Sequence, residues 1–463
     1  MSDKKTERQG INISAKSFII AIAVIFAIMI LSYILAITVP GGAYARKENG
    51  EIISESFKKV DGGIPFWKWI LSPILLLGAD GSTTVIAIIA FLLVIGGVFE
   101  CLGDCRMLKY MLDRITMRFG KSKYKLLAAV MFFFMAVGSL VGSFEECVPF
   151  VPIVVALAVN LGWDPITGLM MSILAVGCGF SAGVFNPFTV GVAQELAGLR
   201  MFSGAGYRAL GFLLIYLLLL ACTSFHAKRV EKKGESTLVQ KNTPRNKDLE
   251  KGLVCFAGIL GAGIVLVLCS PFIPAIRDYT MIIIAVMFLV AGIVASFVCK
   301  MKAKRFFSCF GKGVWGMLPA VLMILMASSV KYTLEQANVL DTVLHKAVGI
   351  SADLPKWEVV IFIYLLVLVM NFFIASGSAK AFMLIPLIMP IAKLCGVPEQ
   401  ICIMAFAFGD GFSNVYYPTN PVLLISLGLA DESYGKWAAK TGVFQLANFL
   451  LTSGLLLLGL VIM

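Results

Sequence analysis

The sequence predicts an all-α polytopic membrane protein built from two inverted repeats, each with a re-entrant hairpin and a broken transmembrane helix. Three observations lead to this fold class: a very apolar composition, a series of apolar segments of membrane-spanning length, and a set of motifs that occurs twice. Of the 463 residues, 59% are hydrophobic and only 14% are charged. A soluble domain of this length could not bury that much apolar surface, so the chain requires a lipid environment.

Apolar segments of about 20 residues, the length that crosses a bilayer, recur from 18–39 to 442–463. Lys and Arg gather in short loops at 106–125, 228–251 and 300–312, which the positive-inside rule places in the cytoplasm. These basic residues do not alternate with aromatic residues, so the net charge of +12 does not indicate nucleic acid binding. We therefore expect a multi-pass protein of the bacterial cytoplasmic (inner) membrane, with a cytoplasmic N-terminus and the lipid bilayer as its partner.

Two segments have the length of a helical pair but a polar, glycine-rich centre. In the first, residues 124–160, the centre reads GSLVGSFEE at 138–146. Backbone can turn at membrane depth only where it is buried in protein or lines a cavity. We therefore predict a re-entrant hairpin that enters and leaves on the cytoplasmic side. Residues 357–395 repeat this pattern with the tip SGSAK at 376–380, and we expect this second hairpin to enter from the outer side.

Each predicted hairpin is followed by an apolar crossing that contains glycines, asparagine and proline. We expect the first crossing to be interrupted at 177–183 and at Asn186-Pro187. The second crossing is expected to break at 409–414 and at Asn420-Pro421. Glycine and proline both disfavour a continuous helix, so each crossing is predicted to consist of two half-helices.

These motifs form an internal repeat. The matches, in order, are Gly142-Ser143 with Gly377-Ser378, Gly162 with Gly396, Gly177-x-Gly-Phe-Ser181 with Gly409-x-Gly-Phe-Ser413, and Asn186-Pro187 with Asn420-Pro421. The repeat divides the chain into a membrane half at 1–226, a cytoplasmic linker at 227–250 and a second membrane half at 251–463. Inverted repeats with discontinuous helices are typical of secondary transporters. The alternative is that the glycines and prolines only allow close helix packing.

In such repeats the half-helix N-termini offer N–H groups to a carboxylate, and unwound carbonyls suit a cation. The polar residues at the hairpin tips and breaks are therefore the predicted substrate ligands: Ser143, Glu145, Glu146, Asn186, Ser376, Ser378, Lys380, Asp410, Asn414 and Asn420. The residues predicted to bind a coupling ion are Gly142, Ser181, Gly377, Asp410 and Ser413.

The charged residues among these have structural alternatives. Glu146 could instead form a capping box with Ser143 at the start of the second hairpin arm, whereas Glu145 is expected to bind substrate or a cation. An intramembrane carboxylate such as Asp410 indicates a functional site by default, as a ligand for a cation, a proton or an amino group. Asp410 and Lys380 could also form a buried pair, and Lys380 could hold a substrate carboxylate.

Other classes of function lack support in the sequence. The eleven cysteines include no Cys-x-x-Cys pair, and there are only two histidines, so neither a metal centre nor a disulfide framework is indicated. A membrane-embedded enzyme would need a nucleophile with a base, or a metal cluster. A channel would normally repeat its selectivity filter around an axis. We expect no enzymatic activity and no cofactor.

Four segments carry a resemblance to a known family: GSFEECVPFVPI (142–153), GFSAGVFNPFTVG (179–191), SGSAKAFMLIP (376–386) and FGDGFSNVYYPTNP (408–421). Through them the chain resembles the YfcC-type and anaerobic C4-dicarboxylate carrier (DcuC-like) group of the ion transporter superfamily, which also contains arginine/ornithine exchangers. The resemblance covers nearly the whole chain and implies two hairpins and two broken helices.

In that superfamily, Ser-Asn-Thr-like hairpin tips hold substrate and sodium. Here Ser143-Phe144-Glu145 and Ser378-Ala379-Lys380 stand in their place, so the sodium stoichiometry of the relatives is not carried over. Whether Na⁺ or H⁺ serves as coupling ion, and whether the chain forms a homodimer as relatives do, stays open.

A site with two or three carboxylates and one lysine suits a small molecule that bears both a cationic group and a carboxylate. The sequence therefore leads us to expect a secondary active transporter that works by alternating access. Its expected substrate is an amino acid of the arginine/ornithine type. The alternative is a Na⁺- or H⁺-coupled C4-dicarboxylate transporter.

Overall fold

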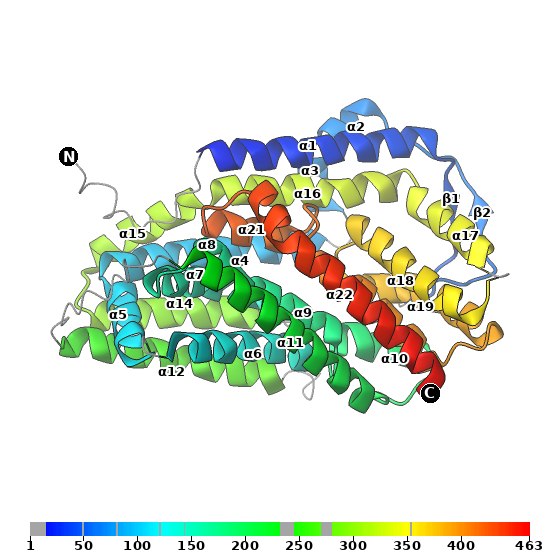
Figure 1. Cartoon of the computed structure of the whole chain (residues 1–463). Coiled ribbons are helices and arrows are strands. Elements are labelled where there is room, and N and C mark those ends of the chain that lie inside the picture. The colour runs from blue at the N-terminus through cyan, green and yellow to red at the C-terminus, as the bar shows by residue number, and fades with distance from the viewer. Residues whose placement is uncertain are drawn as a thin grey trace.

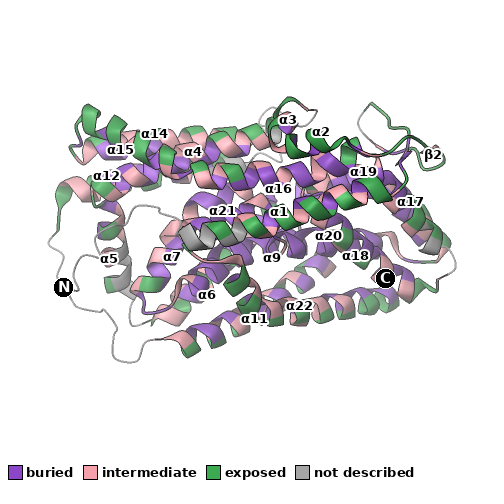
Figure 2. Cartoon of the chain, turned by 90° about the horizontal axis from the view of Figure 1, so that it is seen from above, coloured by how far each residue is buried: buried purple, intermediate pink, exposed green. Residues whose placement is uncertain are grey.

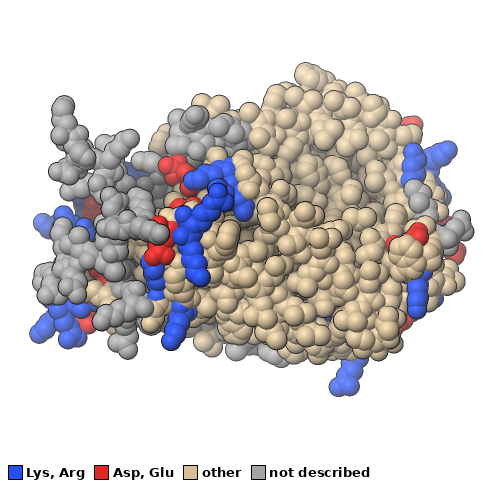
Figure 3. All heavy atoms as spheres, in the orientation of Figure 1, with Lys and Arg blue, Asp and Glu red and all other residues tan. Residues whose placement is uncertain are grey.

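The computed structural model describes residues 15–48, 51–79, 82–119, 122–142, 144–231, 245–269, 280–351 and 354–463. Its long helices run mostly along one direction of the molecule (Figure 1). Within the described residues, eight helical stretches are long and apolar enough to cross a membrane. Figure 3 shows charged side chains gathered toward the two ends of this long direction, with a broad uncharged belt between them. The protein is an all-α polytopic membrane protein, as the sequence predicts.

The first half is almost entirely helical. It opens with α1 (Ala15–Thr38), the antiparallel strands β1 (Gly42–Ala43) and β2 (Lys58–Lys59), and the short helices α2 (Phe66–Ile70), α3 (Ser72–Leu75) and η1 (Leu76–Gly78). It continues with α4 (Ser82–Asp104), α5 (Met107–Phe119), α6 (Lys123–Val141), η3 (Glu145–Phe150) and α7 (Val151–Asn160). It ends with α8 (Pro165–Leu169), the π-helical turn η4 (Met170–Leu174), α9 (Ala175–Ala182), a second π-helical turn η5 (Pro187–Gly191), α10 (Val192–Leu196) and α11 (Ala205–Val230).

The second half starts with α12 (Lys247–Cys269), α14 (Thr280–Val298), α15 (Ala303–Gly316), α16 (Leu318–Gln336) and α17 (Val339–Ser351). It continues with α18 (Lys356–Phe373), α19 (Gly377–Leu394), α20 (Glu399–Asn414), α21 (Pro421–Leu429) and α22 (Tyr434–Ile462). The series from α18 to α22 matches the series from α6 to α11: a helical hairpin, a crossing in two pieces, and one long helix.

The two helical hairpins have nearly the predicted bounds. The pair α6 and α7 spans 123–160, and the pair α18 and α19 spans 356–394. Figure 1 shows α7 toward the end of the molecule that holds α5, and α18 and α19 toward the end that holds the two strands. That the hairpins re-enter the same side of the membrane, and that the two halves are inverted, stay predictions. α11 continues to Val230 and α12 begins at Lys247, so helices extend into both ends of the expected linker at 227–250, whose cytoplasmic position stays a prediction. Residues 1–14 and 232–244 lie outside the described residues.

The predicted breaks are partly wrong in position. The glycines of 177–182 and 409–411 lie inside α9 and α20, and the helices are interrupted only after them, at 183–186 and 415–420. The physical reason is packing: a Cβ on Gly409 would lie 2.9 Å from the carbonyl oxygen of Tyr364 in α18, and one on Gly179 would collide with the backbone of Met135 in α6. These glycines therefore allow each hairpin to pack closely on its broken helix.

The core lies where the two halves meet. α6 packs on α9, α18 packs on α20, and α9 packs directly against α20. Figure 2 shows α9 and α20 almost entirely buried, whereas α1, α11 and α22 carry long exposed faces. Trp69 of α2 fixes this short helix against α1 by donating from Nε1 to the carbonyl oxygen of Met29 at 3.1 Å. The asparagines at the two breaks, Asn186 and Asn420, are buried.

Residues 42–48 and 51–60, which include β1 and β2, form a strap over the second hairpin. The amide of Ile52 donates to the carbonyl of Phe382 at 3.2 Å, and the Ser54 hydroxyl donates to the carbonyl of Pro386 at 3.0 Å. Each of these α19 carbonyls lies four residues before a proline, Pro386 or Pro390, which has no N–H to offer. The strap therefore supplies the donors that the two prolines remove from the helix.

The other end of the strap is attached to α17. Asp341 of α17 accepts from the amide of Tyr44 at 3.0 Å and from the Arg46 guanidinium at 2.9 Å. The ring of Phe57 stacks on His345 with centroids 3.8 Å apart. Figure 1 shows α17 and both strands together at one end of the molecule. The strap thus joins α17 to the second hairpin.

If the Ser54 hydroxyl replaces the donor that Pro390 lacks, the effects of substituting Ser54 and Pro390 on stability should depend on each other. Ser54→Ala should lower the free energy of unfolding by about 0.5–1.5 kcal/mol, because the Pro386 carbonyl loses a donor. In a Pro390→Ala background the loss should be much smaller, since the new amide at 390 can donate to that carbonyl. Unfolding in detergent of both single variants and the double variant measures the coupling. Equal losses in the two backgrounds would contradict this account.

Candidate functional site

The two hairpin tips meet at one short segment, residues 186–189. Gly142, at the end of α6, is in the left-handed conformation with φ 74°, and a Cβ there would collide with the Asn186 side chain. Gly377, at the start of α19, is equally close to this segment: a Cβ there would lie 2.7 Å from Cγ2 of Thr189 and 2.7 Å from Oδ2 of Asp410. The first break therefore lies between the tips of both hairpins.

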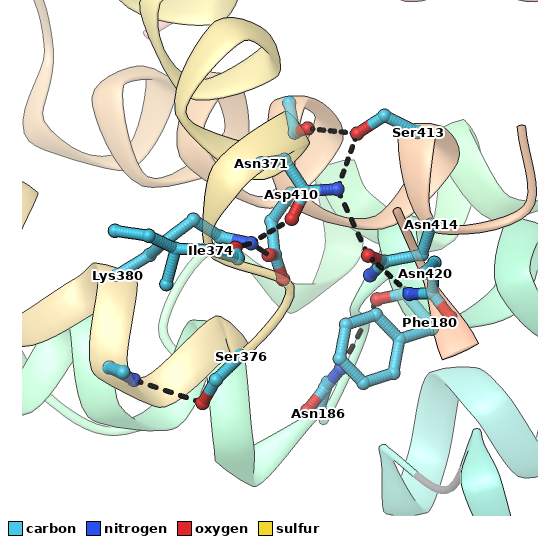
Figure 4. A network of polar contacts seen from close by, with 12 residues as sticks. Phe180, Asn186, Asn371, Ile374, Ser376, Lys380, Asp410, Ser413, Asn414 and Asn420 are labelled. Atoms are coloured by element: carbon cyan, nitrogen blue, oxygen red, sulfur yellow. Dashed lines mark hydrogen bonds and ion pairs between the residues drawn. The ribbon is translucent and has the colours of Figure 1, made fainter. Parts of the chain in front are cut away.

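A buried ion pair lies at the second tip. Nζ of Lys380 in α19 pairs with Oδ1 of Asp410 in α20, and neither side chain has any exposed surface. Nζ also donates to Oδ1 of Asn371 in α18 and to the carbonyl of Ile374 at 2.7 Å. Figure 4 shows these groups converging from the hairpin and the broken helix. The structure thus forms the Lys380–Asp410 pair that the sequence left open as an alternative.

Asn371 extends this cluster to the second break. Its Nδ2 donates to Oγ of Ser413 at 2.6 Å and to Oδ1 of Asn414 at 2.9 Å (Figure 4). The same oxygen of Asn414 accepts from Nδ2 of Asn420 at 3.0 Å. One chain of polar contacts therefore runs from Lys380 to the start of α21.

Both second half-helices begin with an asparagine cap followed by proline. Oδ1 of Asn186 accepts from the amides of Phe188 and Thr189 at 3.0 and 3.3 Å. Oδ1 of Asn420 accepts from the amides of Val422 and Leu423 at 2.9 and 3.4 Å. These first-turn N–H groups are therefore already bound by the protein. Substrate binding by Asn186 and Asn420 stays a prediction, and their observed contacts are those of caps.

The first hairpin brings two carboxylates to the same region. Glu146 is buried, and its Oε2 accepts from the amide of Phe144 at 3.2 Å. Because Phe144 directly precedes η3, this contact is similar to the predicted capping contact at the start of the second arm. Ser143, its predicted partner in the capping box, lies outside the described residues. Glu145 is half-buried and lies within electrostatic range of Glu146 and Asp410. Acids from both halves thus form one cluster.

The hydroxyl residues of the predicted site differ in their roles. Ser181 and Ser413, which match in the repeat, each donate to the carbonyl four residues earlier, at 2.8 and 3.0 Å. Ser376 caps α19 by accepting from the amide of Ala379 at 3.4 Å, and Ser378 is half-buried in the first turn of that helix. Ion binding by Ser181, Ser413 and the tip glycines Gly142 and Gly377 stays a prediction.

Three polar residues near the site were missed by the sequence reasoning. Asn371 joins Lys380 to the second break, Thr189 lies between Gly377 and the first break, and Arg208 contacts the first break from α11. Asn371 and Arg208 each interrupt an otherwise apolar run, so a search for intramembrane polar residues would have found them. Oγ1 of Thr189 is buried and has no hydrogen-bond partner among the described residues.

The described part of the chain contains no group of three or more His, Cys, Asp or Glu side chains arranged to hold a metal ion. Glu145 lies within electrostatic range of Glu146 and of Asp410, while Glu146 accepts from the amide of Phe144 and Asp410 pairs with Lys380.

Comparison with curated proteins gives two relatives. The chain is 29% identical over 401 residues to an Escherichia coli (strain K12) protein named "Putative basic amino acid antiporter YfcC", covering 81% of this chain and 78% of the relative. It is 22% identical over 375 residues to an uncharacterized protein of Haemophilus influenzae, covering 77% and 72% of the two chains.

Solved structures with a similar chain course include the Alcanivorax borkumensis YdaH transporter, with 18% identity, a TM-score of 0.44, and coverage of 95% of this chain and 97% of that one. Neisseria gonorrhoeae MtrF, described as illuminating a class of antimetabolite efflux pumps, has 14% identity, a TM-score of 0.43 and 94% coverage of both chains. The profile of the family described as C4-dicarboxylate anaerobic carrier (DcuC) matches residues 18–461. The protein therefore belongs to the DcuC family of membrane transporters.

Proposed function

We propose that this transporter exchanges basic amino acids of the arginine/ornithine type across the membrane by alternating access, without chemical conversion of the substrate. The observation that carries the proposal is the charge of the cluster at the hairpin tips. It contains three carboxylates, Glu145, Glu146 and Asp410, and one buried lysine, Lys380, which pairs with Asp410. This excess of negative charge favours a cationic group on the substrate.

The buried ion pair suggests how exchange arises. A carboxylate without a counter-charge at membrane depth is costly, so Lys380 neutralises Asp410 when no substrate is bound. A guanidinium or ammonium group of the substrate can compete with Lys380 for Asp410. The Lys380 ammonium released in this way is then free to attract the substrate carboxylate. One lysine would thus serve both the empty and the loaded carrier.

The names of the relative and of the family point to two different substrate classes. The Escherichia coli relative is named a basic amino acid antiporter, which agrees with the proposal. The family description names C4-dicarboxylates. A dianion would have to displace Asp410 from Lys380 and would then lie close to Glu145 and Glu146, which repel it. Coupling ions on those acids would be needed to offset that repulsion.

Counterflow in proteoliposomes tests the proposal. Purified protein is reconstituted with unlabelled arginine or ornithine inside, and uptake of the labelled amino acid is followed without an imposed ion gradient. We expect uptake to require the internal amino acid and to be unaffected by external succinate or fumarate. Proteoliposomes loaded with glutamate or succinate serve as matched controls. Uptake of labelled succinate that depends on a Na⁺ or H⁺ gradient, with no arginine or ornithine exchange, would establish the dicarboxylate alternative instead.

A further inference from the structure

Arg208 is a buried arginine that belongs to no ion pair in the described part of the chain. It is the fourth residue of α11, and only 2% of its surface is exposed. Its Nε donates to the carbonyl of Gly183 at 3.0 Å, and its Nη2 donates to the carbonyl of Val184 at 3.2 Å. Its Nη1 donates to the carbonyl of Ser203 at 2.9 Å and to Oε1 of Gln400 at 3.4 Å. All four acceptors are uncharged oxygens.

Gly183 and Val184 are the start of the first break. Because α9 ends at Ala182, their carbonyls have no donor in a following turn, and the C-terminal end of a helix carries a partial negative charge. The amides of Val184 and Phe185 are bound on the other side, by the hydroxyl and the carbonyl of Ser139 in α6, both at 3.1 Å. The first hairpin thus binds the amides of Val184 and Phe185, and Arg208 binds the carbonyls of Gly183 and Val184.

The corresponding carbonyls at the start of the second break accept from neutral donors. Trp437 is the fourth residue of α22, and its Nε1 donates to the carbonyl of Val415 at 2.9 Å. The hydroxyl of Tyr434, the first residue of α22, donates to the carbonyl of Tyr416 at 3.0 Å. In both halves the long last helix, α11 or α22, therefore binds the first two carbonyls of the break, but only α11 uses a charged group to do so.

We propose that Arg208 is the resident cation of the first break. Its guanidinium supplies, from within the protein, the positive charge that an unwound carbonyl stretch at membrane depth would otherwise take from a bound ion. Arg208 is a positioning residue: it holds 183–184, and through them the Asn186 cap that meets the first hairpin tip. Transport therefore needs no coupling cation at this break, whichever substrate is carried, so this inference does not rest on the proposed substrate.

A direct role for Arg208 in binding a substrate carboxylate does not fit these contacts. A guanidinium has five N–H donors, and four contacts to protein oxygens are already made from its three nitrogens. An exchangeable anion would have to displace carbonyls that have no other donor among the described contacts. The charge of Arg208 therefore acts on the backbone of the break.

Chemical rescue tests the proposal with the full-length protein in detergent. Arg208→Ala should lower the melting temperature and leave a cavity at the break. Millimolar guanidinium should then raise the melting temperature of the variant but not of the wild type, because a ligand that binds only the folded state stabilises it. Urea has a similar planar shape without the charge, and it should have no effect at the same concentration. Arg200→Ala, at an exposed arginine in the preceding loop, is the matched control.

Transport provides the second readout. Arg208→Gln, which keeps planar donors but no charge, should reduce the transport rate in proteoliposomes about tenfold or more for whichever substrate the wild type transports. Arg208→Lys should retain more of that transport activity than Arg208→Gln. Stabilisation of Arg208→Ala by Na⁺ or K⁺ would also support a cation requirement at these carbonyls. Equal rescue by urea and guanidinium, no rescue by any cation, or full activity of Arg208→Gln would overturn the proposal. If the wild type transported neither arginine nor ornithine, that result would contradict only the proposed substrate, and the melting-temperature experiment would still test the role of Arg208.

Discussion

Asp410→Asn is expected to destabilise the protein by about 3–5 kcal/mol and to stop exchange. The reason is that the change leaves the Lys380 ammonium buried without its counter-charge, and neither residue has exposed surface. Lys380→Met should have a similar effect, because it leaves the Asp410 carboxylate unpaired. Unfolding in detergent and counterflow in proteoliposomes measure the two consequences separately.

The double variant distinguishes a structural pair from a functional one. Lys380→Met combined with Asp410→Asn removes both charges, so its stability should return most of the way to that of the wild type. Exchange should stay absent, because the group that binds the cationic end of the substrate is missing. Leu394→Ala, at an exposed residue that ends the same helix, is a control for a substitution in α19 that leaves the pair intact. A double variant that folds and exchanges at the wild-type rate would show that the pair serves stability alone.

Glu145→Gln is expected to weaken binding of arginine and ornithine roughly ten- to hundred-fold, since it removes a charge-assisted contact worth about 1.5–3 kcal/mol. Its effect on stability should be small, because Glu145 is only half-buried and forms no ion pair within the described residues. Competition against labelled arginine in counterflow measures the change in affinity.

Glu146→Gln is the natural comparison. Glu146 is buried and accepts from the amide of Phe144, so its neutral form should affect the hairpin tip more than the affinity. If Glu145→Gln left arginine and ornithine exchange intact while abolishing the Na⁺ or H⁺ dependence of dicarboxylate uptake, the acid would serve a coupling ion. The C4-dicarboxylate alternative would then replace the proposed function.

Many features of the fold could be predicted because they depend on neighbours in the sequence. The length of an apolar run determines whether a helix can cross a membrane, so the hairpin bounds 124–160 and 357–395 differ by only one residue from those observed. Asn186-Pro187 and Asn420-Pro421 were expected to interrupt the two crossings, and each pair does lie where an interruption ends, with the asparagine capping a helix whose first residue is proline. Capping is a contact between residues two or three apart, so it can be read locally.

The positions of the breaks depended on tertiary packing. From the sequence, 177–183 and 409–414 look like interruptions because glycine disfavours a helix. In the structure these glycines instead bring α9 against α6 and α20 against α18, and the helices continue through them. The energy gained by close packing outweighs the weak local preference of glycine, and no local pattern reveals which helix will lie opposite.

The sequence alone therefore determined the membrane class, the bounds of the two helical hairpins and the family, while re-entry of the hairpins and inversion of the halves stay predictions. Only the tertiary structure decided which polar groups meet. Lys380 pairs with an acid thirty residues away and Arg208 contacts carbonyls twenty-four and twenty-five residues before it, both across helix–helix contacts. Buried charges must find partners wherever the packing of helices places them, because no water is available at that depth.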